Sequence, residues 1–570
     1  MGPRVISSVL VRSNVRASTF QLAYPFIRYF SSRARPIPQT FLFQPDNVEI
    51  IKDIDQKIDE KKIKFRRHPG VMGFSVQKVE TDIQKAIGRV LIKGEPLGTY
   101  KAQAKALEKH MMNRRLPIES YDIQKLRADI ERRLRQSLAK KGMTPENCET
   151  EEDRLELEES IQKKSEQRLK TSIYNWKPME YNSPSKCMTY CVLRFAPEYS
   201  ALRRVLNEIV KRAPDYKPKH VFDFGSGMGT VYFATEKTWP ASSEEYVCVE
   251  PSEDMADLFR LLLRDGVAEN EAGHRNVTFR SFLPATNERE YDLVVSAYSL
   301  FELPSYEERM RTVANLWMKT SDFLVLIERG TNAGFRAIIE ARDYILAGAY
   351  EIYRNALPDL VEKNVDPVEV ELILKRKDIT EAEKFRLVRE KYPDVEFATL
   401  LPHGHVFAPC AHDMGCPRLM DVTPCNFSVR YFPLRLSGGK EVPEEEVFSF
   451  VILRKGYAPP AADRWPRIVR EPRKSKACIW CQTCSPHGVL EDKAFHKGPA
   501  SSERGKQFRL VKKSSWGDLL PMVSSYELGP KSSHGERESS RSEDELEEDD
   551  EESADLGNGS NLDTGARDQR

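Results

Sequence analysis

A short apolar segment that runs into three alternating glycines constrains this chain more than any other feature of its 570 residues. The segment is Val221-Phe222-Asp223-Phe224, and Gly225, Gly227 and Gly229 follow it at every second position. Glycine lets the backbone turn tightly and lets a ligand approach where a Cβ would clash. The pattern therefore predicts a strand that ends in a ligand-binding turn.

An acidic residue at the end of the next apolar segment supports that interpretation. Glu250 lies about twenty residues after the glycines, where an acid can accept hydrogen bonds from both ribose hydroxyls of a bound nucleoside. The sequence lacks the final glycine of the longer dinucleotide fingerprint, which argues against a nicotinamide enzyme. Asp223, the three glycines and Glu250 are the candidate cofactor-binding residues.

Short apolar strands alternate with helices in the middle of the chain. Predicted strands are residues 220–224, 246–250, 277–279, 291–296 and 322–328, and predicted helices include 197–212, which begins with Pro197, 305–319 and 333–350. This alternation implies a parallel, doubly wound α/β sheet with helices on both faces. Two later β-rich segments, 427–434 and 447–454, are predicted to form an antiparallel pair at the edge of the sheet.

These features resemble the class I methyltransferase pattern, with a Rossmann-like core. In that pattern the glycine loop lies under the methionine moiety of S-adenosylmethionine, and the acid holds the ribose. The transfer site would lie beside residues 296–303, which lack both the Asn/Asp-Pro-Pro-Tyr/Phe signature of amino-methylating members and a cysteine nucleophile. Tyr298 and Glu302 lie near the expected pocket mouth, although such residues more often pack or cap. Methyl transfer stays open, because a fold alone does not specify function.

Cysteines in the C-terminal part of the chain predict a metal centre. They form two groups, Cys410, Cys416 and Cys425, then Cys478, Cys481 and Cys484. Four thiolates are the usual complement of both an iron–sulfur cluster and a structural zinc site. The spacing fits neither the zinc pairs nor the ferredoxin pattern, and the scattered ligands favour a cluster. For zinc, the alternative ligands are His403, His405 and His412.

The other four cysteines are interpreted as ordinary core or surface residues. They are Cys148, Cys187, Cys191 and Cys248. Structural disulfides are not expected, because the mitochondrial matrix predicted from the N-terminus keeps thiols largely reduced.

The two ends of the chain differ in charge. Residues 1–38 contain six arginines, and no acidic residue precedes Asp46. This composition is typical of a mitochondrial transit peptide, and the alternative is a basic arm that contacts nucleic acid. Residues 454–513 hold fifteen Lys or Arg against five Asp or Glu, a field that favours nucleic-acid phosphates. Residues 536–553 hold eleven acids and predict a disordered tail.

The predicted organisation has five segments, and no membrane partner is expected because no stretch reaches about 18 consecutive apolar residues. The segments are a transit peptide (1–38), a charged helical region (39–175), a methyltransferase-like domain (176–455) with a cysteine-rich insertion (401–434), a basic extension that completes the metal site (456–525), and an acidic tail (526–570).

The chain also resembles the methyltransferase-like protein 17 family of mitochondrial small-ribosomal-subunit assembly factors. The resemblance runs from Tyr181 to Pro521. The stretches that carry it are Arg194–Tyr199, Phe222–Gly229, Glu250–Ser252, Ser299–Leu303, Glu328–Thr331, the blocks around Cys410, Cys416 and Cys425, and Ser514–Pro521. The cysteine blocks make it specific, because they are not a general methyltransferase feature.

The resemblance implies a mitochondrial matrix protein that binds the immature small ribosomal subunit, its rRNA and ribosomal proteins, and supports mitochondrial translation. It also implies a 4Fe-4S cluster, with Cys410, Cys416 and Cys425 as the first three ligands. The last ligand of the family precedes a Thr/Cys-Pro-x-Gly pattern, which favours Cys484 here, with Cys478 and Cys481 as alternatives. Two other functions stay open: an active methyltransferase acting on small-subunit rRNA or a ribosomal protein, and a redox or iron sensor.

Overall fold

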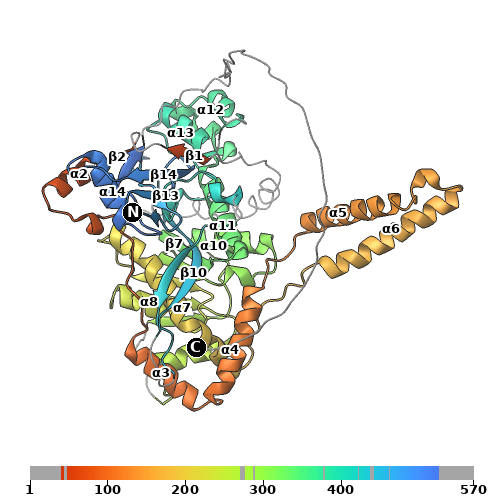
Figure 1. Ribbon diagram of the computed structural model, residues 1–570, viewed down its shortest axis with the longest axis horizontal. Coiled ribbons are helices and arrows are strands. Elements are labelled where there is room, and N and C mark those ends of the chain that lie inside the picture. Colours follow the sequence, from red (N-terminus) through yellow and green to blue (C-terminus); the bar gives the residue numbers. More distant parts are fainter. Residues whose placement is uncertain are drawn as a thin grey trace, which may run out of the picture. The chain divides into compact units, whose positions relative to one another are not determined.

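The computed structural model describes residues 40–43, 48–269, 276–286, 289–376, 379, 381–420, 423–436, 442–460 and 463–524. Its centre is an eight-stranded sheet (Figure 1). The strands are β3 (His220–Phe224), β4 (Glu245–Val249), β5 (Val277–Arg280), β6 (Tyr291–Ala297), β7 (Thr320–Arg329), β8 (Gly404–Ala408), β9 (Phe427–Tyr431) and β10 (Glu444–Lys455). Seven of them match the strand segments predicted from the sequence, and β8 is not among those segments. Strand β10 lies between β7 and β8, so its predicted position at the edge of the sheet is wrong.

The strand order identifies the fold class. It runs β5-β4-β3-β6-β7-β10-β8, and β9 also pairs with β10. The first five strands are parallel, whereas β10 is antiparallel to β7, β8 and β9. The order reverses direction between β3 and β6, which is the switch point where doubly wound sheets bind ligands. This is the predicted class I methyltransferase fold.

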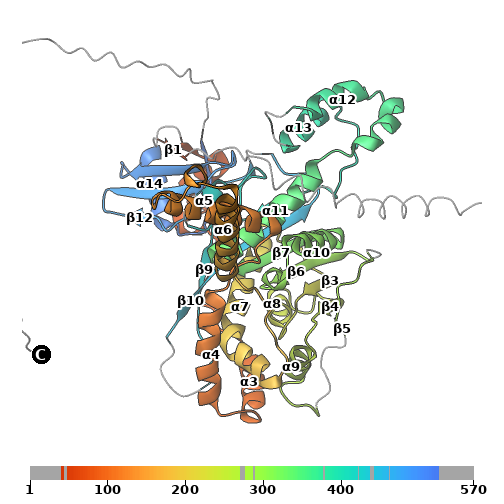
Figure 2. The ribbon, with the colours of Figure 1, turned by 90° about the vertical axis from the view of Figure 1, so that its right-hand side faces the viewer.

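Helices cover both faces of this sheet (Figure 2). They are α7 (Pro184–Arg212), α8 (Thr230–Thr238), α9 (Glu253–Leu263), α10 (Tyr306–Met318) and α11 (Asn332–Tyr350). Successive strand residues enter different cores: Val221 packs with α7, α8 and α9, whereas Phe222 packs with α10 and α11. Side chains alternate across a strand, so a sheet buried on both faces needs the continuous apolar runs seen here.

Helix α7 begins earlier than predicted. The sequence analysis placed a helix start at Pro197, but the helix starts at Pro184, and Pro197 lies in its interior. The Ser183 hydroxyl caps the helix by accepting a hydrogen bond from the Lys186 amide at 3.3 Å. An interior proline removes one helical hydrogen bond, yet most of α7 is buried, and this packing outweighs the local cost.

The charged N-terminal region is mainly helical. It contains α2 (Lys52–Asp59), α3 (Thr81–Ile92), α4 (Leu97–Met112), α5 (Ser120–Ala139) and α6 (Glu151–Ser172). Ile87 of α3 and Tyr100 of α4 join the core around α7. Helices α5 and α6 run beside each other in both ribbon views, and Arg135 and Glu158 form a two-bonded ion pair between them.

A second, smaller sheet is built mainly from the C-terminal segment. Its strands are β1 (Thr40–Phe43), β11 (Arg467–Ile468), β12 (Arg473–Lys474), β13 (Cys478–Cys484) and β14 (Leu490–His496), and helix α14 (Glu503–Lys513) follows them. A further pair joins β2 (Val48–Ile50) to β15 (Met522–Ser524). The first and last described segments of the chain therefore pack together.

Two other helices, α12 (Pro367–Leu374) and α13 (Glu381–Lys391), lie between α11 and β8 in the sequence. They pack around a small apolar core of their own. Among the described residues, no helix combines the length and the apolar character needed to cross a lipid bilayer.

Candidate functional site

A cavity of about 330 Å³ lies at the carboxyl ends of β3 and β4. Gly225 and Gly227 line it from the loop after β3, and Glu250 lines it from the end of β4. Its volume falls within the range of small-molecule sites. The structure therefore brings three of the five candidate cofactor-binding residues to one cavity, which we term the cofactor cavity.

The loop geometry requires glycine at two positions. Gly225 has a φ of +73°, and a Cβ there would lie 2.4 Å from the Cβ of Ser299. Gly229 has a φ of +85°, and a Cβ there would lie 2.2 Å from the Phe259 ring. Both clashes involve side chains packed under the loop, so the glycines allow the loop to approach the sheet and to start α8.

The Glu250 carboxylate is tied to the loop that it faces. One oxygen accepts a hydrogen bond from the Gly227 amide at 2.9 Å, and the other accepts one from the Ser252 amide at 2.9 Å. A carboxylate has about four lone-pair sites, so acceptor capacity is left for ribose hydroxyls. Burial raises the pKa of Glu250, and the two amide hydrogen bonds oppose that rise.

Asp223 and Gly229 do not line the cavity. Asp223 is fully buried beneath the loop, where the Tyr246 hydroxyl donates a hydrogen bond to one carboxylate oxygen at 3.2 Å. The other oxygen has no partner among the described residues. Burial raises the pKa of Asp223 to about 8. In this structure Asp223 and Gly229 support the loop.

One wall of the cofactor cavity comes from the N-terminal region. Pro178, Met179 and Tyr181, which connect α6 to α7, line the cavity. Glu302 holds this segment, because its carboxylate accepts hydrogen bonds from the Met179 amide at 2.7 Å and from Arg114 Nη2 at 2.9 Å. Sequence reasoning placed Glu302 near the mouth but missed the connecting segment, which carries no motif.

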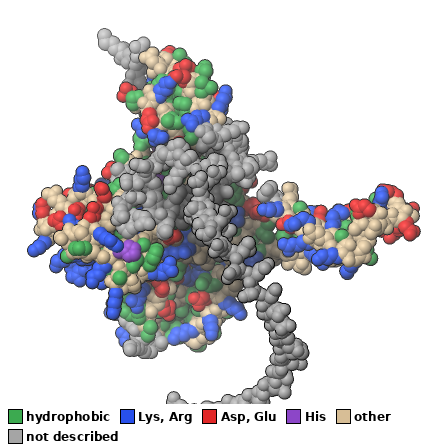
Figure 3. All heavy atoms as spheres, turned by 45° about the horizontal axis from the view of Figure 1, so that its top comes forward, with side chains coloured by type: hydrophobic (Ala, Val, Ile, Leu, Met, Phe, Trp, Pro, Cys, Tyr) green, Lys and Arg blue, Asp and Glu red, His purple; other side chains and the backbone are tan. Residues whose placement is uncertain are grey.

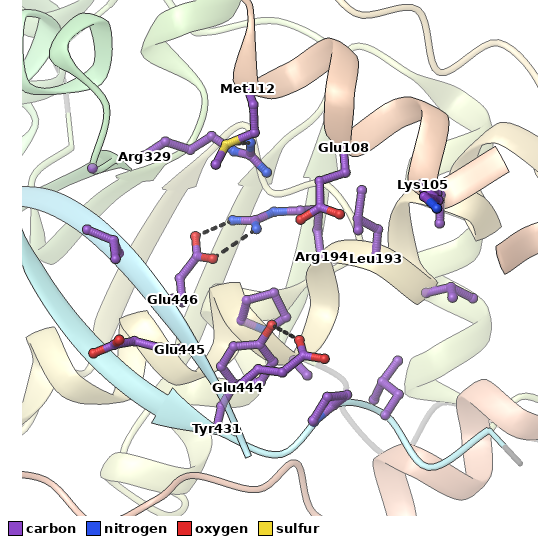
Figure 4. Close-up of a pocket in the computed structure, with 18 of the residues that line it drawn as sticks. Lys105, Glu108, Met112, Leu193, Arg194, Arg329, Tyr431, Glu444, Glu445 and Glu446 are labelled. Atoms are coloured by element: carbon purple, nitrogen blue, oxygen red, sulfur yellow. Dashed lines mark hydrogen bonds and ion pairs between the residues drawn. The ribbon is translucent and has the colours of Figure 1, made fainter. Parts of the chain in front are cut away.

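A charged network closes the end of the cavity next to Tyr298. The Tyr298 ring is half-buried, and the guanidinium of Arg194 lies over it at 5.3 Å. Arg194 also pairs with Glu198 at 3.1 Å and with Glu446 at 2.7 Å. Figure 4 shows Arg194 pointing at Glu446 within a second cavity of about 470 Å³. Arg194 and Tyr298 thus form a wall between the two cavities.

The second candidate site contains four cysteines, which we term the cysteine site. Cys416 and Cys425 share an apolar core with side chains of α11, and Cys425 also packs in the core that contains Cys484. Cys410, Cys416 and Cys425 all raise the pKa of Cys484, so the four sulfurs lie close enough to interact electrostatically. The segment between β8 and β9 thereby meets the end of β13.

The other two cysteines of β13 do not reach this site. Cys481 lies on the opposite face of the strand, in the core with Ile479 and Phe495. Cys478 is six residues from Cys484, about 20 Å along an extended strand. Of the three alternatives on β13, Cys484 is the one that the structure brings to Cys410, Cys416 and Cys425.

His412 is the one predicted histidine near the sulfurs, with Nε2 3.2 Å from Cys484 Sγ. The ring nitrogens of His403 and His405 instead contact the backbone oxygens of Ala349 and Gly456. Among the described residues, no three His, Cys, Asp or Glu side chains converge on the position of a single metal ion. An iron–sulfur cluster has its own volume, so its ligands surround it rather than meet at one point.

The environment of the cysteine site suits an anionic cluster with thiolate ligands. Burial raises the pKa of Cys425 to about 12, while the buried guanidiniums of Arg342, Arg418 and Arg467 act to lower it. Arg342 is held in place by donating to the backbone oxygens of His412 and Met414 at 3.0 and 2.7 Å. Nearby cations favour thiolates, and four thiolates are the donor set of both a 4Fe-4S cluster and a zinc site.

The sheet order, the glycine loop and the acid after β4 define a methyltransferase-like protein of class I. The profile of a protein family described as "Mitochondrial small ribosomal subunit Rsm22" matches residues 184–357 and 389–521. The chain belongs to this family. Its membership confirms the predicted localisation in the mitochondrial matrix, whereas the predicted transit peptide and acidic tail lie outside the described residues.

Relatives with known names agree with this assignment. The human "Ribosome assembly protein METTL17, mitochondrial" is 31% identical over 481 residues, which cover 84% of this chain and 90% of that protein. The "Rsm22-cox11 tandem protein 2, mitochondrial" of Schizosaccharomyces pombe is 22% identical over 364 residues, 57% of this chain and 42% of that protein.

Solved structures similar to this chain include two methyltransferases. The magnesium protoporphyrin IX methyltransferase (ChlM) from Synechocystis PCC 6803 with bound SAM is 17% identical and covers 31% of this chain and 76% of its own, with a TM-score of 0.23. A putative RNA methyltransferase, PH1948 from Pyrococcus horikoshii, is 10% identical and covers 44% and 82%, with a TM-score of 0.21.

Proposed function

We propose that this protein assists assembly of the mitochondrial small ribosomal subunit by binding its rRNA, and that the cysteine site holds a 4Fe-4S cluster. Membership of the small-subunit family and the ribosome-assembly role in the human relative's name support the first part. The observation that supports the cluster is that Cys410, Cys416 and Cys425 lie close to Cys484, beside three buried arginines. These four cysteines would hold the cluster.

The cysteine site lies where the basic C-terminal segment joins the methyltransferase-like domain. Cys484 belongs to β13 of the small sheet, and the other three cysteines lie between β8 and β9 of the large sheet. A bound cluster would link these segments, with three cysteine ligands on the segment between β8 and β9 and one on β13. Metal binding of this kind contributes directly to folding, so the cluster would fix the RNA-binding segment in place and support mitochondrial translation in that way.

The test compares anaerobically purified wild type with Cys410→Ser and Cys484→Ser, and uses Cys478→Ser as the matched control on the same strand. We expect broad visible absorption and about four irons per chain in wild type and Cys478→Ser, as for a cluster with four cysteine ligands. Both should fall in the other two variants, together with co-sedimentation with immature small subunits. If the protein were colourless and held one zinc per chain, the site would be a structural zinc site and not a cluster. The iron-sensing function would then be excluded.

The second candidate function is methyl transfer to small-subunit rRNA or a ribosomal protein. The cofactor cavity with Gly225, Gly227 and Glu250 favours it, because these residues suit S-adenosylmethionine. The position of Arg194 over Tyr298 opposes it, because Tyr298 lies in residues 296–303, beside which the transfer site is expected. We therefore expect a cavity that can bind the cofactor and supports the fold without turnover.

Calorimetric titration with S-adenosylmethionine measures binding, and transfer of a labelled methyl group to immature small subunits measures turnover. If wild type transferred more labelled methyl to the RNA or protein of the subunits than a Gly225→Ala variant does, the non-catalytic assignment would be wrong.

A further inference from the structure

One large aromatic side chain of the small sheet faces solvent. Trp480, in the middle of β13, is 47% exposed. Its cross-strand neighbours are Arg473 on β12 and Ala494 on β14. Side chains of directly paired residues point to the same face of a sheet. Trp480 therefore lies between a small residue and an exposed arginine, on what we term the outer face of the small sheet.

The opposite face of this sheet is the one that holds the fold together. Ile479 and Cys481 alternate with Trp480 along β13, and both pack in the core with Phe508 and Val511 of α14. Because α14 covers that face, the exposure of Trp480 does not reflect a missing core. Burying an indole ring is strongly favourable, so an exposed one beside a complete core indicates a surface that contacts something else.

Two cations lie at the outer face. Arg473 is exposed and is paired with Trp480, so its side chain points to the same side of the sheet. Lys476 is exposed in the turn that joins β12 to β13. Figure 3 shows Lys and Arg side chains, with Asp and Glu among them, on the side of the molecule where Figure 1 places α2 and α14.

Two acids lie near these cations. Asp492 is on the outer face, because it is paired with Gln482, whose side chain donates a hydrogen bond to it at 2.9 Å. Glu471 accepts a hydrogen bond from the Trp516 amide at 3.1 Å. Both carboxylates keep their charge, so the positive field of this segment comes from the excess of Lys and Arg over Asp and Glu in residues 454–513, fifteen against five.

We propose that Trp480 stacks on an unpaired RNA base, and that Arg473 and Lys476 contact the flanking phosphates. This proposal deepens the proposed function, since it names the form of RNA that the basic segment binds. Every base has an aromatic face, so an exposed aromatic side chain in a basic surface is the usual platform for single-stranded nucleic acid. The bases of a duplex are stacked on each other and present no free face, so the partner is a single-stranded stretch. A protein partner is less favoured, because the excess of Lys and Arg in residues 454–513 favours phosphates, although Trp and Arg are also common in protein interfaces.

The test uses the full chain and three RNA probes of about ten nucleotides: oligo-uridine, oligo-adenosine and an RNA duplex. We expect Trp480→Ala to raise the Kd for both single strands about tenfold, the usual loss when a stacking side chain is truncated, and to leave duplex binding within about twofold. Trp480→Phe keeps an aromatic face and should retain most of the affinity. Lys476→Gln should reduce the slope of log K against log salt by about one.

Ile92→Ala is the matched control, because Ile92 is 86% exposed on α3, away from the outer face. If Trp480→Ala bound both single-stranded RNA probes as tightly as wild type, the proposal that Trp480 stacks on a base would be wrong. If Trp480→Ala instead lost small-subunit ribosomal proteins while keeping RNA, the outer face would be a protein-docking surface, which also overturns it. Wild type that bound none of the probes and no small-subunit rRNA would overturn the proposed RNA contact itself, and the platform with it.

Discussion

Gly225 leaves no room for a side chain, and this gives a prediction at the scale of one residue. In Gly225→Ala the new Cβ would meet Ser299 at 2.4 Å, and alanine would adopt a φ of +73°. We expect the free energy of unfolding to fall by about 1–3 kcal/mol, as measured by denaturant unfolding.

Gly98→Ala is the control for that experiment. A Cβ at Gly98 would meet nothing within 4 Å, and Gly98 lies in the first turn of α4. Because alanine favours a helix more than glycine does, this variant should be neutral or slightly stabilised. Equal destabilisation of both variants would contradict the loop geometry described above.

Asp223 gives a second prediction at this scale, on pH dependence. Its pKa is raised from 3.8 to about 8 by burial, so between these values the folded protein binds the proton more tightly than the unfolded chain does. Stability from this group is therefore full below pH 4 and is lost as the pH rises toward 8. Asp223→Asn removes the titration, and wild type should lose at least about 1 kcal/mol more than this variant between pH 5 and 8.5. If wild type and Asp223→Asn lost the same free energy of unfolding between pH 5 and 8.5, this prediction would be wrong.

At the scale of elements, a buried ion pair joins α7 to β11. Arg467 donates to both oxygens of Glu208, at 2.7 and 2.9 Å, and both side chains are fully buried. Arg467→Met would leave Glu208 with Arg204 alone, and removing one partner of a buried pair costs about 3–5 kcal/mol. Arg135→Met breaks an exposed pair between α5 and α6 and should cost less than about 1 kcal/mol. Chemical denaturation measures both, and similar losses would contradict this difference.

The same pair has a pH signature with the opposite sign to that of Asp223. The two arginines hold the pKa of Glu208 at about 2, below its ordinary value of 4.5. The stability that this provides is full above pH 4.5 and is lost as the pH falls toward 2. Acid unfolding of Arg467→Met should show less of this dependence between pH 4.5 and 2 than wild type.

The sequence predicts the elements of the large sheet better than it predicts how they meet. Continuous apolar runs and the glycine loop locate β3 to β7, because local pattern determines those strands. The start of α7 is not predictable in this way, because Pro197 is a local signal that burial of the whole helix overrides. Likewise, the spacing cannot choose among Cys478, Cys481 and Cys484. That choice depends on which face of β13 meets the loop between β8 and β9.

At the scale of the whole described chain, residues far apart in sequence build one core. Val48, Ile50 and Ile54 from the N-terminal region pack with Phe508 and Leu520 from the C-terminal segment. Strand β2 pairs with β15, and β1 pairs with β14. The basic segment therefore depends for its fold on residues that precede the methyltransferase-like domain by more than a hundred positions, and no local pattern reveals such a dependence.

This association predicts different outcomes for two N-terminal deletions. Residues 1–38 are the predicted transit peptide, which is removed after import, so a chain that starts at residue 39 should be as thermally stable as the full chain. Removal of residues 1–60 deletes β1, β2 and α2 and exposes the apolar side chains of α14 that they cover. Each apolar side chain lost from a core contributes about 1.5–3 kcal/mol, so residues 503–522 should exchange amide hydrogens much faster and single-stranded RNA should bind more weakly. If residues 503–522 were equally protected in both deletions, the C-terminal segment would fold without its N-terminal partner.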